Sequence, residues 1–292
     1  MKIIITGGKG MLGRTLQRHL AQHELLIADL PELDILQYEK LEAEFIRFAP
    51  DAVIHCAAMT KVDDCETEPE RAFRLNGMAS ANVAKAAAKC AARLIAISTD
   101  YVFYGERTEH TPFSPSSDDG YLESDMPLPQ TVYGKSKLAG ERSIIDLCPG
   151  STIVRIAWLY GALGPSFVHT MAKLGMDAAA PALKVVDDQR GNPTSTDAVA
   201  ELLKFLLAHP EVNGIVHGTC EGIASWYELT VELFRLLGCK RKVTPCTTAE
   251  YPRPAPRPAF SALAKGKLKA AGYTMPNWKT ALAEFVSTEF KR

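Results

Sequence analysis

Apolar runs of strand length alternate with longer amphipathic stretches through the first half of the chain. The apolar runs cover residues 2–6, 24–28, 52–55, 93–98 and 151–158. Apolar side chains recur at helical spacing through Leu16 and Leu20 and over residues 38–48, 69–92 and 133–147. Because continuously apolar strands are typical of parallel sheets covered by helices on both faces, this order predicts an α/β fold with a Rossmann-like, doubly wound parallel sheet.

Beyond residue 160 the pattern becomes less regular. Short strand-like runs at residues 182–186 and 215–218 alternate with helical stretches at 196–208, 226–237, 262–271 and 278–290. We expect residues 1–160 to form a dinucleotide-binding Rossmann domain and residues 161–292 to form a smaller, partly helical substrate-binding lobe, with the two lobes interleaved. We also expect a pocket where this lobe closes over the carboxyl edge of the sheet.

Composition and charge exclude several classes of partner. The 292-residue chain has a formal net charge of −1, which gives no electrostatic case for nucleic acid or an anionic membrane as partner. No apolar run has the length of a membrane span, and residues 2–6 are too few for the apolar core of a signal peptide. The seven cysteines are scattered, without Cys-x-x-Cys or zinc-site spacing. We therefore expect a cytoplasmic protein with reduced thiols and no metal site.

A glycine-rich turn follows the first predicted strand at once. Gly7, Gly10 and Gly13 give the pattern Gly-x-x-Gly-x-x-Gly between that strand and a helix. Small residues at this place let backbone N–H groups and the helix N-terminus approach a pyrophosphate closely. A glycine turn without a ligand is the alternative, and the coincidence of strand, glycines and helix favours a dinucleotide site.

Two residues give opposite indications about the cofactor. Asp29 ends the second predicted strand, where a carboxylate accepts hydrogen bonds from the adenosine ribose and repels a 2′-phosphate. Lys9 lies within the glycine loop, where a cation favours that phosphate. The choice between NADH and NADPH therefore stays open.

Tyr133 and Lys137 share one face of a predicted helix, because they are four residues apart. A nearby ammonium group favours the phenolate, so we expect Lys137 to lower the pKa of Tyr133 and make the phenol a better proton donor to a developing alkoxide. Thr99 ends the fourth predicted strand, where its hydroxyl can bind a substrate carbonyl oxygen. In isolation the pair is common on exposed helices, and such a threonine more often caps its own turn.

With these motifs in place, the sequence resembles the extended short-chain dehydrogenase/reductases, and more narrowly the dTDP-4-dehydrorhamnose reductases, over nearly the whole chain. The strings that carry the resemblance are Ser98-Thr-Asp-Tyr-Val-Phe103, Tyr133-Gly-Lys-Ser-Lys137, His55-Cys-Ala-Ala-Met-Thr-Lys-Val-Asp63, Arg74-Leu-Asn76, Trp158-Leu-Tyr-Gly161, Asp188-Gln-Arg-Gly-Asn-Pro-Thr194 and Arg257-Pro-Ala-Phe-Ser261. The resemblance implies reduction of the 4-keto group of a dTDP-sugar, the last step of dTDP-L-rhamnose synthesis.

The resemblance also implies roles for individual residues. Thr99, Tyr133 and Lys137 would form the catalytic triad. The residues that would contact NADPH or NADH are Gly7, Gly10, Met11, Leu12, Gly13, Asp29, Asp34, Ile35, Ala57, Ala58, Thr60, Tyr133 and Lys137. The dTDP-sugar would face Asp100, Tyr101, Trp158 and Arg257, and a guanidinium suits a diphosphate. Trp158 also fits a core position, and a homodimer stays open.

The chain departs from the family pattern near the proposed sugar site. The string Arg155-Ile-Ala157 lacks the two hydroxyls of the usual Arg-Thr-Ser, Ser166 stands where Asn is usual, and the string Leu128-Pro-Gln-Thr-Val132 lacks the usual Asn before the catalytic tyrosine. The segment 105–122 is about ten residues longer than expected, and long connections often have a functional character. These departures bear on the exact sugar more than on the reaction type.

Two other functions fit the same motifs. Epimerisation or dehydration of a nucleotide sugar would return the hydride to the substrate, and Asp100 beside Thr99 fits a dehydratase in part. A non-catalytic nucleotide-binding module, similar to the regulatory subunits of methionine adenosyltransferase, would not need the proton donor. The intact Thr99, Tyr133 and Lys137 therefore argue against the binding module, and net oxidation of the cofactor separates a reductase from an epimerase or a dehydratase.

Overall fold

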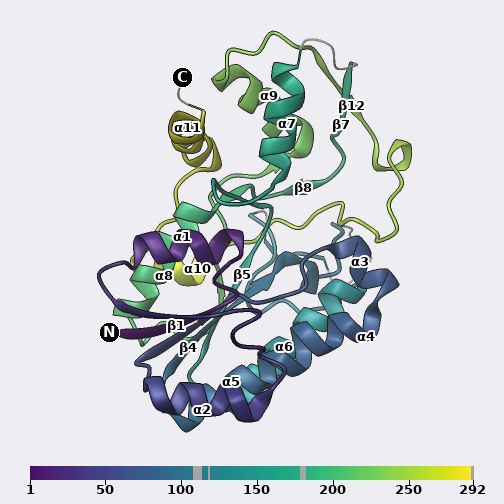
Figure 1. The fold of residues 1–292 in the computed structure, drawn as a ribbon. Coiled ribbons are helices and arrows are strands. Elements are labelled where there is room, and N and C mark those ends of the chain that lie inside the picture. Colours follow the sequence, from purple (N-terminus) through teal and green to yellow (C-terminus); the bar gives the residue numbers. More distant parts are fainter. Residues whose placement is uncertain (108–113, 118, 178–181, 291–292) are drawn as a thin grey trace.

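A parallel β-sheet forms the centre of the molecule (Figure 1). The computed structural model describes residues 1–107, 114–117, 119–177 and 182–290. Within this part of the chain the sheet has six strands in the order β10-β5-β4-β3-β1-β2. Their bounds are β1 Lys2–Thr6, β2 Glu24–Ala28, β3 Ala52–His55, β4 Arg93–Thr99, β5 Thr152–Ile156 and β10 Gly214–His217. The strand order reverses beside β1, which places a ligand crevice at the carboxyl ends of β1 and β3. The predicted doubly wound α/β fold is confirmed.

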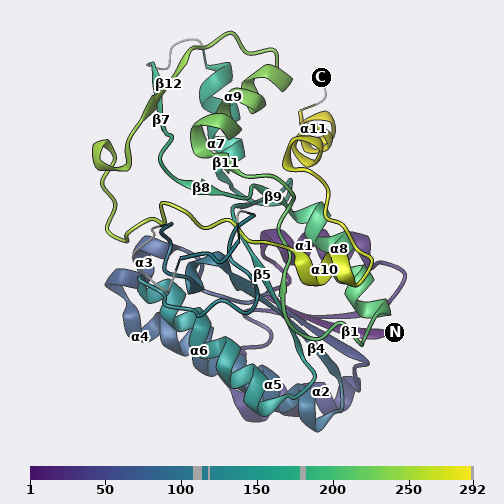
Figure 2. The ribbon, with the colours of Figure 1, turned by 180° about the vertical axis from the view of Figure 1, so that it is seen from behind.

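Helices cover both faces of the sheet (Figures 1 and 2). Because side chains alternate along a strand, Ile3 and Ile5 face one layer and Ile4 faces the other. The first layer holds α1 (Met11–His19), α8 (Thr196–Ala208) and α10 (Gly266–Ala270), and the second holds α2 (Tyr38–Phe48), α5 (Ala79–Lys89) and α6 (Val132–Leu147). Burial of these apolar faces fixes the helices against the two faces of the sheet.

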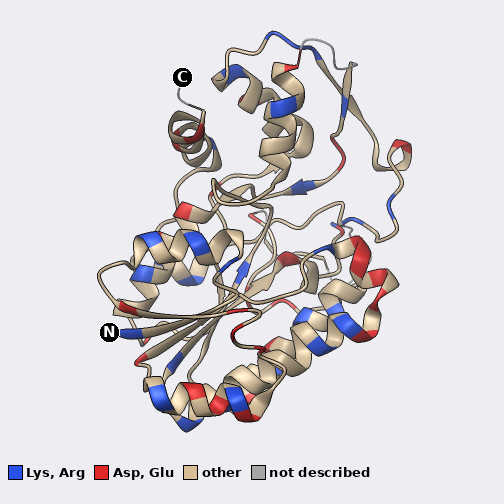
Figure 3. Ribbon diagram, in the orientation of Figure 1, with Lys and Arg blue, Asp and Glu red and all other residues tan. Residues whose placement is uncertain are grey.

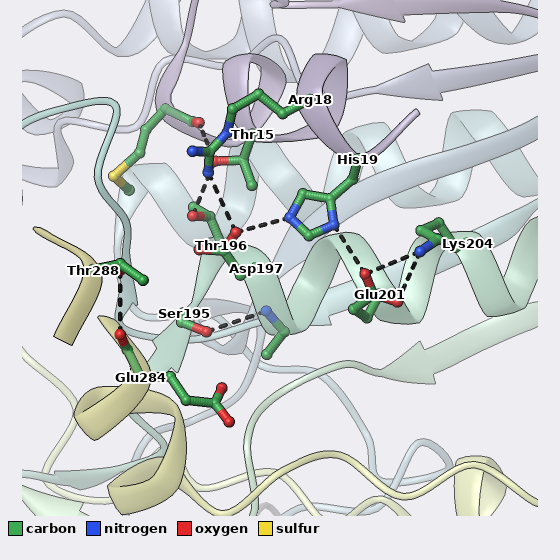
Figure 4. Close-up of polar contacts among 12 residues, drawn as sticks. Thr15, Arg18, His19, Ser195, Thr196, Asp197, Glu201, Lys204, Glu284 and Thr288 are labelled. Carbon is green, nitrogen blue, oxygen red and sulfur yellow. Dashed lines mark hydrogen bonds and ion pairs between the residues drawn. The ribbon is translucent and has the colours of Figure 1, made fainter. Parts of the chain in front are cut away.

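Helix α1 is also held by polar contacts to α8 (Figure 4). The Thr15 hydroxyl donates a hydrogen bond to Thr196 over 3.0 Å. The ring nitrogens of His19 lie 2.8 Å from the carboxylate of Asp197 and 2.9 Å from that of Glu201. Since α1 begins directly after the glycine loop, these contacts hold that loop against the sheet.

The smaller lobe lies above the carboxyl edge of the sheet (Figure 1). It contains α7 (Phe167–Met176), α9 (Trp226–Leu236), α11 (Trp278–Glu289) and the parallel pair β7 (Leu183–Val186) and β12 (Val243–Cys246). Two pairs of short strands lie between the lobes. Strand β6 (Leu159–Tyr160) pairs with β9 (Thr194–Ser195), and β8 (Arg190–Gly191) pairs with β11 (Ala224–Ser225). The chain crosses between the lobes more than once.

Three predicted elements differ from the structure. The strand expected at 215–218 is β10, which pairs with β5 in the central sheet and not in the smaller lobe, because Val216 completes the core beside Val154. The helix expected at 262–271 is helical only in α10, since residues 262–264 run extended and buried beside Tyr121. The helix expected at 69–92 is continuous from α4 (Pro69–Ala72) through the π-helix η1 (Phe73–Met78) to the end of α5 at Lys89, so it differs in its π-helical middle part and in its end.

The remaining short helices are α3 (Val62–Thr67) and the 3-10 helices η2 (Asp100–Val102) and η3 (Thr248–Glu250). Of these, α3 and η2 border the crevice. In the long segment 105–122, residues 108–113 and 118 lie outside the described residues. Its end is fixed by Tyr121, which is fully buried, stacks on Phe103 with ring centroids 4.2 Å apart and accepts a hydrogen bond from the Gly105 N–H.

Charges of both signs alternate along the helices of the second layer (Figure 3). This distribution agrees with the net charge of −1 over the chain. All seven cysteines are free thiols. Among the described residues, no helix combines the length and the apolar character needed to cross a bilayer.

Candidate active site

One large cavity, of about 720 Å³, lies at the carboxyl ends of β1, β3, β4 and β5. Every residue predicted to contact the cofactor lines it, from Gly7 in the first loop to Lys137 in α6. Thr99, Asp100, Tyr101 and Trp158 line it as well. Of the predicted site residues, Arg257 alone lies outside this lining. The fold therefore brings the candidate cofactor and catalytic groups to one place.

The glycine loop has room for backbone but not for side chains. Gly7 has a left-handed φ of +67°, and a Cβ there would lie 2.6 Å from the Ala57 backbone. A Cβ on Gly13 would lie 2.4 Å from the Gly7 carbonyl oxygen. A Cβ on Gly10, in contrast, would meet only that oxygen, at 3.2 Å. Gly10 thus leaves space beside the N-terminus of α1, as a pyrophosphate site requires.

Helix α6 begins where its sequence provides a cap. The Thr131 hydroxyl accepts a hydrogen bond from the Gly134 N–H over 3.0 Å, so the helix starts at Val132 and presents Tyr133 in its first turn. A side chain at Gly134 would lie 2.2 Å from the Tyr101 carbonyl oxygen. The close approach of α6 to η2 brings Tyr133 beside Thr99 and Tyr101, and the two tyrosine rings meet edge to face at 5.6 Å.

Lys137 points from α6 toward the sheet. Its ammonium group is buried and donates a hydrogen bond to the Ile97 carbonyl oxygen over 2.8 Å. Burial lowers the pKa of Lys137 to about 8, and the charge of Glu141 works in the opposite direction. The lysine is therefore still mostly a cation at neutral pH.

The expected lowering of the Tyr133 pKa is wrong. Burial raises the pKa of this phenol above its ordinary value, the hydrogen bond with Thr99 lowers it in part, and Asp100 raises it further. Desolvation has the largest effect on this pKa, and Lys137 is not among the groups that shift it, which spacing along a helix could not reveal. Tyr133 thus holds its proton at neutral pH, which is the form that a proton donor needs.

Thr99 and Asp100 form one polar unit at the end of β4. The Thr99 hydroxyl accepts a hydrogen bond from the Tyr101 N–H over 3.2 Å and donates one to the Asp100 carboxylate over 3.0 Å. Thr99 therefore caps its own turn as well as lining the cavity. Burial raises the pKa of Asp100 to about 6, although hydrogen bonds from Ser261 and Thr99 lower it in part.

The π-helix η1 supports the site from behind. Asn76 accepts a hydrogen bond from the Met59 N–H over 2.8 Å and donates one to the Ser136 hydroxyl over 3.0 Å. These bonds join the loop after β3 to α6, one residue before Lys137. The fully buried ring of His55 bonds Thr6 and Ser80, and burial lowers its pKa to about 3, so it stays neutral. The sequence motifs around His55 and Asn76 thus hold the cavity wall.

Trp158 lines the cavity and is also part of an aromatic stack. Its backbone has a left-handed φ of +48°, and its ring lies parallel to that of Trp226 with centroids 3.6 Å apart. Trp226 in turn donates a hydrogen bond to the Gln189 side chain over 3.0 Å and contacts Phe167. Trp226 is absent from the predicted site, because nothing in its local sequence indicates a partner far along the chain.

Arg257 is engaged elsewhere. Its guanidinium donates hydrogen bonds to the Asp63 carboxylate over 2.8 Å and to the Ala255 carbonyl oxygen over 3.0 Å. Asp63 also accepts a hydrogen bond from the Ala255 N–H over 3.1 Å. The contact fastens the proline-rich segment 251–258 to α3, next to the cavity.

Two of the departures from the family pattern, at Ile156-Ala157 and at Ser166, have a defined place in the structure. Arg155 and Glu141 form a two-pronged ion pair of 2.9 and 2.7 Å, with both side chains at most 3% exposed. Ile156 and Ala157 give the cavity an apolar wall. Ser166 caps α7 by accepting a hydrogen bond from the His169 N–H.

Comparison with known proteins supports one family. The model of the RmlD substrate binding domain family matches residues 1–290. A probable dTDP-4,6-dihydroxy-2-methyloxan-3-one 4-ketoreductase of Streptomyces antibioticus is 39% identical and covers 97% of this chain and 94% of its own. The crystal structure of a dTDP-4-dehydrorhamnose reductase from Clostridium acetobutylicum superposes with a TM-score of 0.92 at 42% identity, covering 100% of both chains. The crystal structure of a dTDP-4-dehydrorhamnose reductase from Bacillus anthracis in complex with NADP superposes with a TM-score of 0.91 at 35% identity. The match covers 98% of this chain and 99% of that chain.

Proposed function

Because the chain belongs to the RmlD substrate binding domain family, we propose that it is a dTDP-4-dehydrorhamnose reductase. It reduces the 4-keto group of dTDP-4-dehydro-6-deoxy-L-mannose and yields dTDP-L-rhamnose, with NADPH or NADH as cofactor. The observation that carries this proposal is the cavity in which Thr99, Tyr133 and Lys137 lie together with the glycine loop. A cytoplasmic location and a homodimer stay predictions.

The residues of the glycine loop fit a dinucleotide. Gly7 and Gly13 keep the loop so close to neighbouring backbone that added side chains would collide with it, while Gly10 leaves open space. Asp34, Ile35 and the small residues after β3 continue this lining toward the centre of the sheet. When bound, a reduced nicotinamide supplies the hydride. The residues of the chain position the two reactants and supply the proton.

Tyr133 is the proton donor in this proposal. As charge develops on the carbonyl oxygen during reduction, the phenol gives its proton to that oxygen. Thr99, which shares a hydrogen bond with Tyr133, can offer its hydroxyl proton to the same oxygen by turning away from Asp100. Lys137 lines the same cavity, where its positive charge would favour the phenolate left after proton transfer.

Trp158, Asp100 and Tyr101 border the part of the cavity where the sugar would bind. Arg257 could meet the diphosphate only if it exchanged its contact with Asp63, because its guanidinium is now paired there. The apolar wall formed by Ile156 and Ala157 suits a 6-deoxy sugar, which has a methyl group at C6.

Product analysis tests this function. The protein is incubated with dTDP-4-dehydrorhamnose and either NADPH or NADH, and the dTDP-sugar is isolated and identified by NMR. We expect dTDP-L-rhamnose, with one reduced cofactor oxidised for each product molecule. A new dTDP-sugar formed without net oxidation would instead indicate an epimerase or a dehydratase, and cofactor binding without any product would indicate a binding module.

The Streptomyces antibioticus relative favours a second candidate, a 4-ketoreductase for another dTDP-sugar. The same hydride and proton donors serve either substrate, so the choice depends on the sugar wall. Assays of several dTDP-4-keto sugars under one set of conditions separate these candidates by their kcat/KM ratios.

A further inference from the structure

Asp29 links the glycine loop to the end of β2. Its carboxylate accepts hydrogen bonds from the Lys9 N–H and from the Leu30 N–H, each over 2.8 Å. A carboxylate has room for further donors on both oxygens, so ribose hydroxyls can still bind there. Asp29 lies in the position that meets the adenosine ribose in folds of this type. The contacts with Lys9 and Leu30 hold it at the wall of the cavity.

The Lys9 side chain reaches the segment that directly follows Asp29. Its ammonium group lies 2.6 Å from the Glu32 carboxylate and 2.5 Å from the Leu30 carbonyl oxygen. The hydrogen bond from Lys9 lowers the pKa of Glu32, which is therefore charged at neutral pH. The one cation of this loop thus already has an anionic partner.

The balance of charge at this end of the cavity is negative. Asp29 and Glu32 carry two negative charges against the single positive charge of Lys9. Of the lysines and arginines in the described part of the chain, Lys9 and Lys137 line the cavity. Lys137 donates to the carbonyl oxygen of Ile97 in β4 and serves the catalytic end. A 2′-phosphate beside Asp29 would therefore depend on Lys9 for a counter-charge.

We propose that Glu32 determines the cofactor preference of this chain, by holding Lys9 so that the site favours NADH over NADPH. The inference rests on the dinucleotide site of the proposed function. A ribose hydroxyl can donate to Asp29 while the contact between Lys9 and Glu32 stays intact. A 2′-phosphate has to take Lys9 away from Glu32 and then lies beside the Asp29 carboxylate. Glu32 itself need not touch the cofactor.

The expected change in NADPH affinity depends on how far Lys9 and Glu32 are exposed to solvent. The side chains of Lys9 and Glu32 are 48% and 66% exposed, so their pair is partly screened by solvent. An ion pair at an exposed site typically changes an equilibrium constant by no more than about fivefold. We therefore expect Glu32→Gln to strengthen NADPH binding about threefold to fivefold and to leave NADH binding within about twofold.

The experiment measures binding of each cofactor without substrate, by fluorescence titration or calorimetry at low ionic strength. It compares the wild-type chain, Glu32→Gln, Lys9→Met and the double variant. Glu44→Gln is the matched control, because Glu44 also pairs with a basic residue, Arg47, but lies on α2 and does not line the cavity. Since the assay needs no turnover, it does not depend on the identity of the sugar.

Four results together support the proposal. The wild-type chain binds NADH more tightly than NADPH, Glu32→Gln narrows that difference, and Lys9→Met widens it. In the Lys9→Met background, Glu32→Gln has no further effect on NADPH, because Glu32 acts through Lys9. The proposal would be overturned if Glu32→Gln left the ratio of the NADH and NADPH dissociation constants unchanged. It would also be overturned if Glu32→Gln strengthened NADPH binding equally in the wild-type and Lys9→Met backgrounds. Failure of both cofactors to bind would refute the dinucleotide site as well.

Discussion

The substitution Gly13→Ala tests how closely the glycine loop packs. A Cβ at this position would lie 2.4 Å from the Gly7 carbonyl oxygen, 2.5 Å from the Gly8 Cα and 2.7 Å from the Gly8 carbonyl oxygen. All three atoms belong to backbone, so no side chain can rotate away. Overpacking of this kind costs about 3 kcal/mol at the upper end of its usual range.

Alanine in a helix offsets part of this cost. Gly13 lies inside α1, where alanine is more favourable than glycine by about 1 kcal/mol. We therefore expect a net loss of about 2 kcal/mol in the free energy of unfolding, which lowers the Tm of a chain of this length by roughly 3 °C. Displacement of Gly7 and Gly8 should also weaken NADH binding.

Gly266→Ala is the control for this substitution. Gly266 also lies in a helix, α10, but a Cβ there would meet nothing within 4 Å. Thermal unfolding followed by circular dichroism should show a lower Tm for Gly13→Ala and an unchanged or higher Tm for Gly266→Ala. Equal unfolding temperatures for the two variants would refute the close packing of the loop.

Two further substitutions probe the surroundings of the catalytic groups. Glu141→Gln leaves Arg155 buried without its carboxylate partner, and we expect urea unfolding to show a loss of about 3–5 kcal/mol. The same change removes a charge that raises the pKa of Lys137, so the fall in turnover on the alkaline side should move to lower pH. Trp226→Ala removes the ring stacked on Trp158, and we expect a higher KM for the dTDP-sugar with NADH affinity retained; an unchanged KM would contradict a positioning role for Trp226.

Much of the Rossmann layer could be predicted because local and global signals agree there. The bounds of β1, β2, β3 and α2 coincide with the predicted apolar runs, and the start of α6 is set by the Thr131 cap. Glycine spacing predicted a loop that the structure places against neighbouring backbone. In these segments, each residue mainly meets neighbours from adjacent elements.

The remaining features depend on partners that are distant in sequence. The π-helix η1 contains Asn76, which bonds the loop after β3 and α6. The place of β10 in the central sheet depends on its pairing with β5, some 60 residues earlier. The raised pKa of Tyr133 comes from burial, which helical spacing does not report. Pairs such as Trp158 with Trp226 have no local signal either.

The most direct test of the proposed activity is the absorbance of reduced nicotinamide at 340 nm, with dTDP-4-dehydrorhamnose added to the wild-type chain and to Tyr133→Phe in parallel. Tyr133→Phe keeps the ring and removes the proton donor. We predict that the absorbance falls with the wild-type chain. The variant should still bind the cofactor, but its turnover should be lower by about 10²-fold or more. No loss of absorbance with the wild-type chain, or near-normal turnover in Tyr133→Phe, would contradict the proposal.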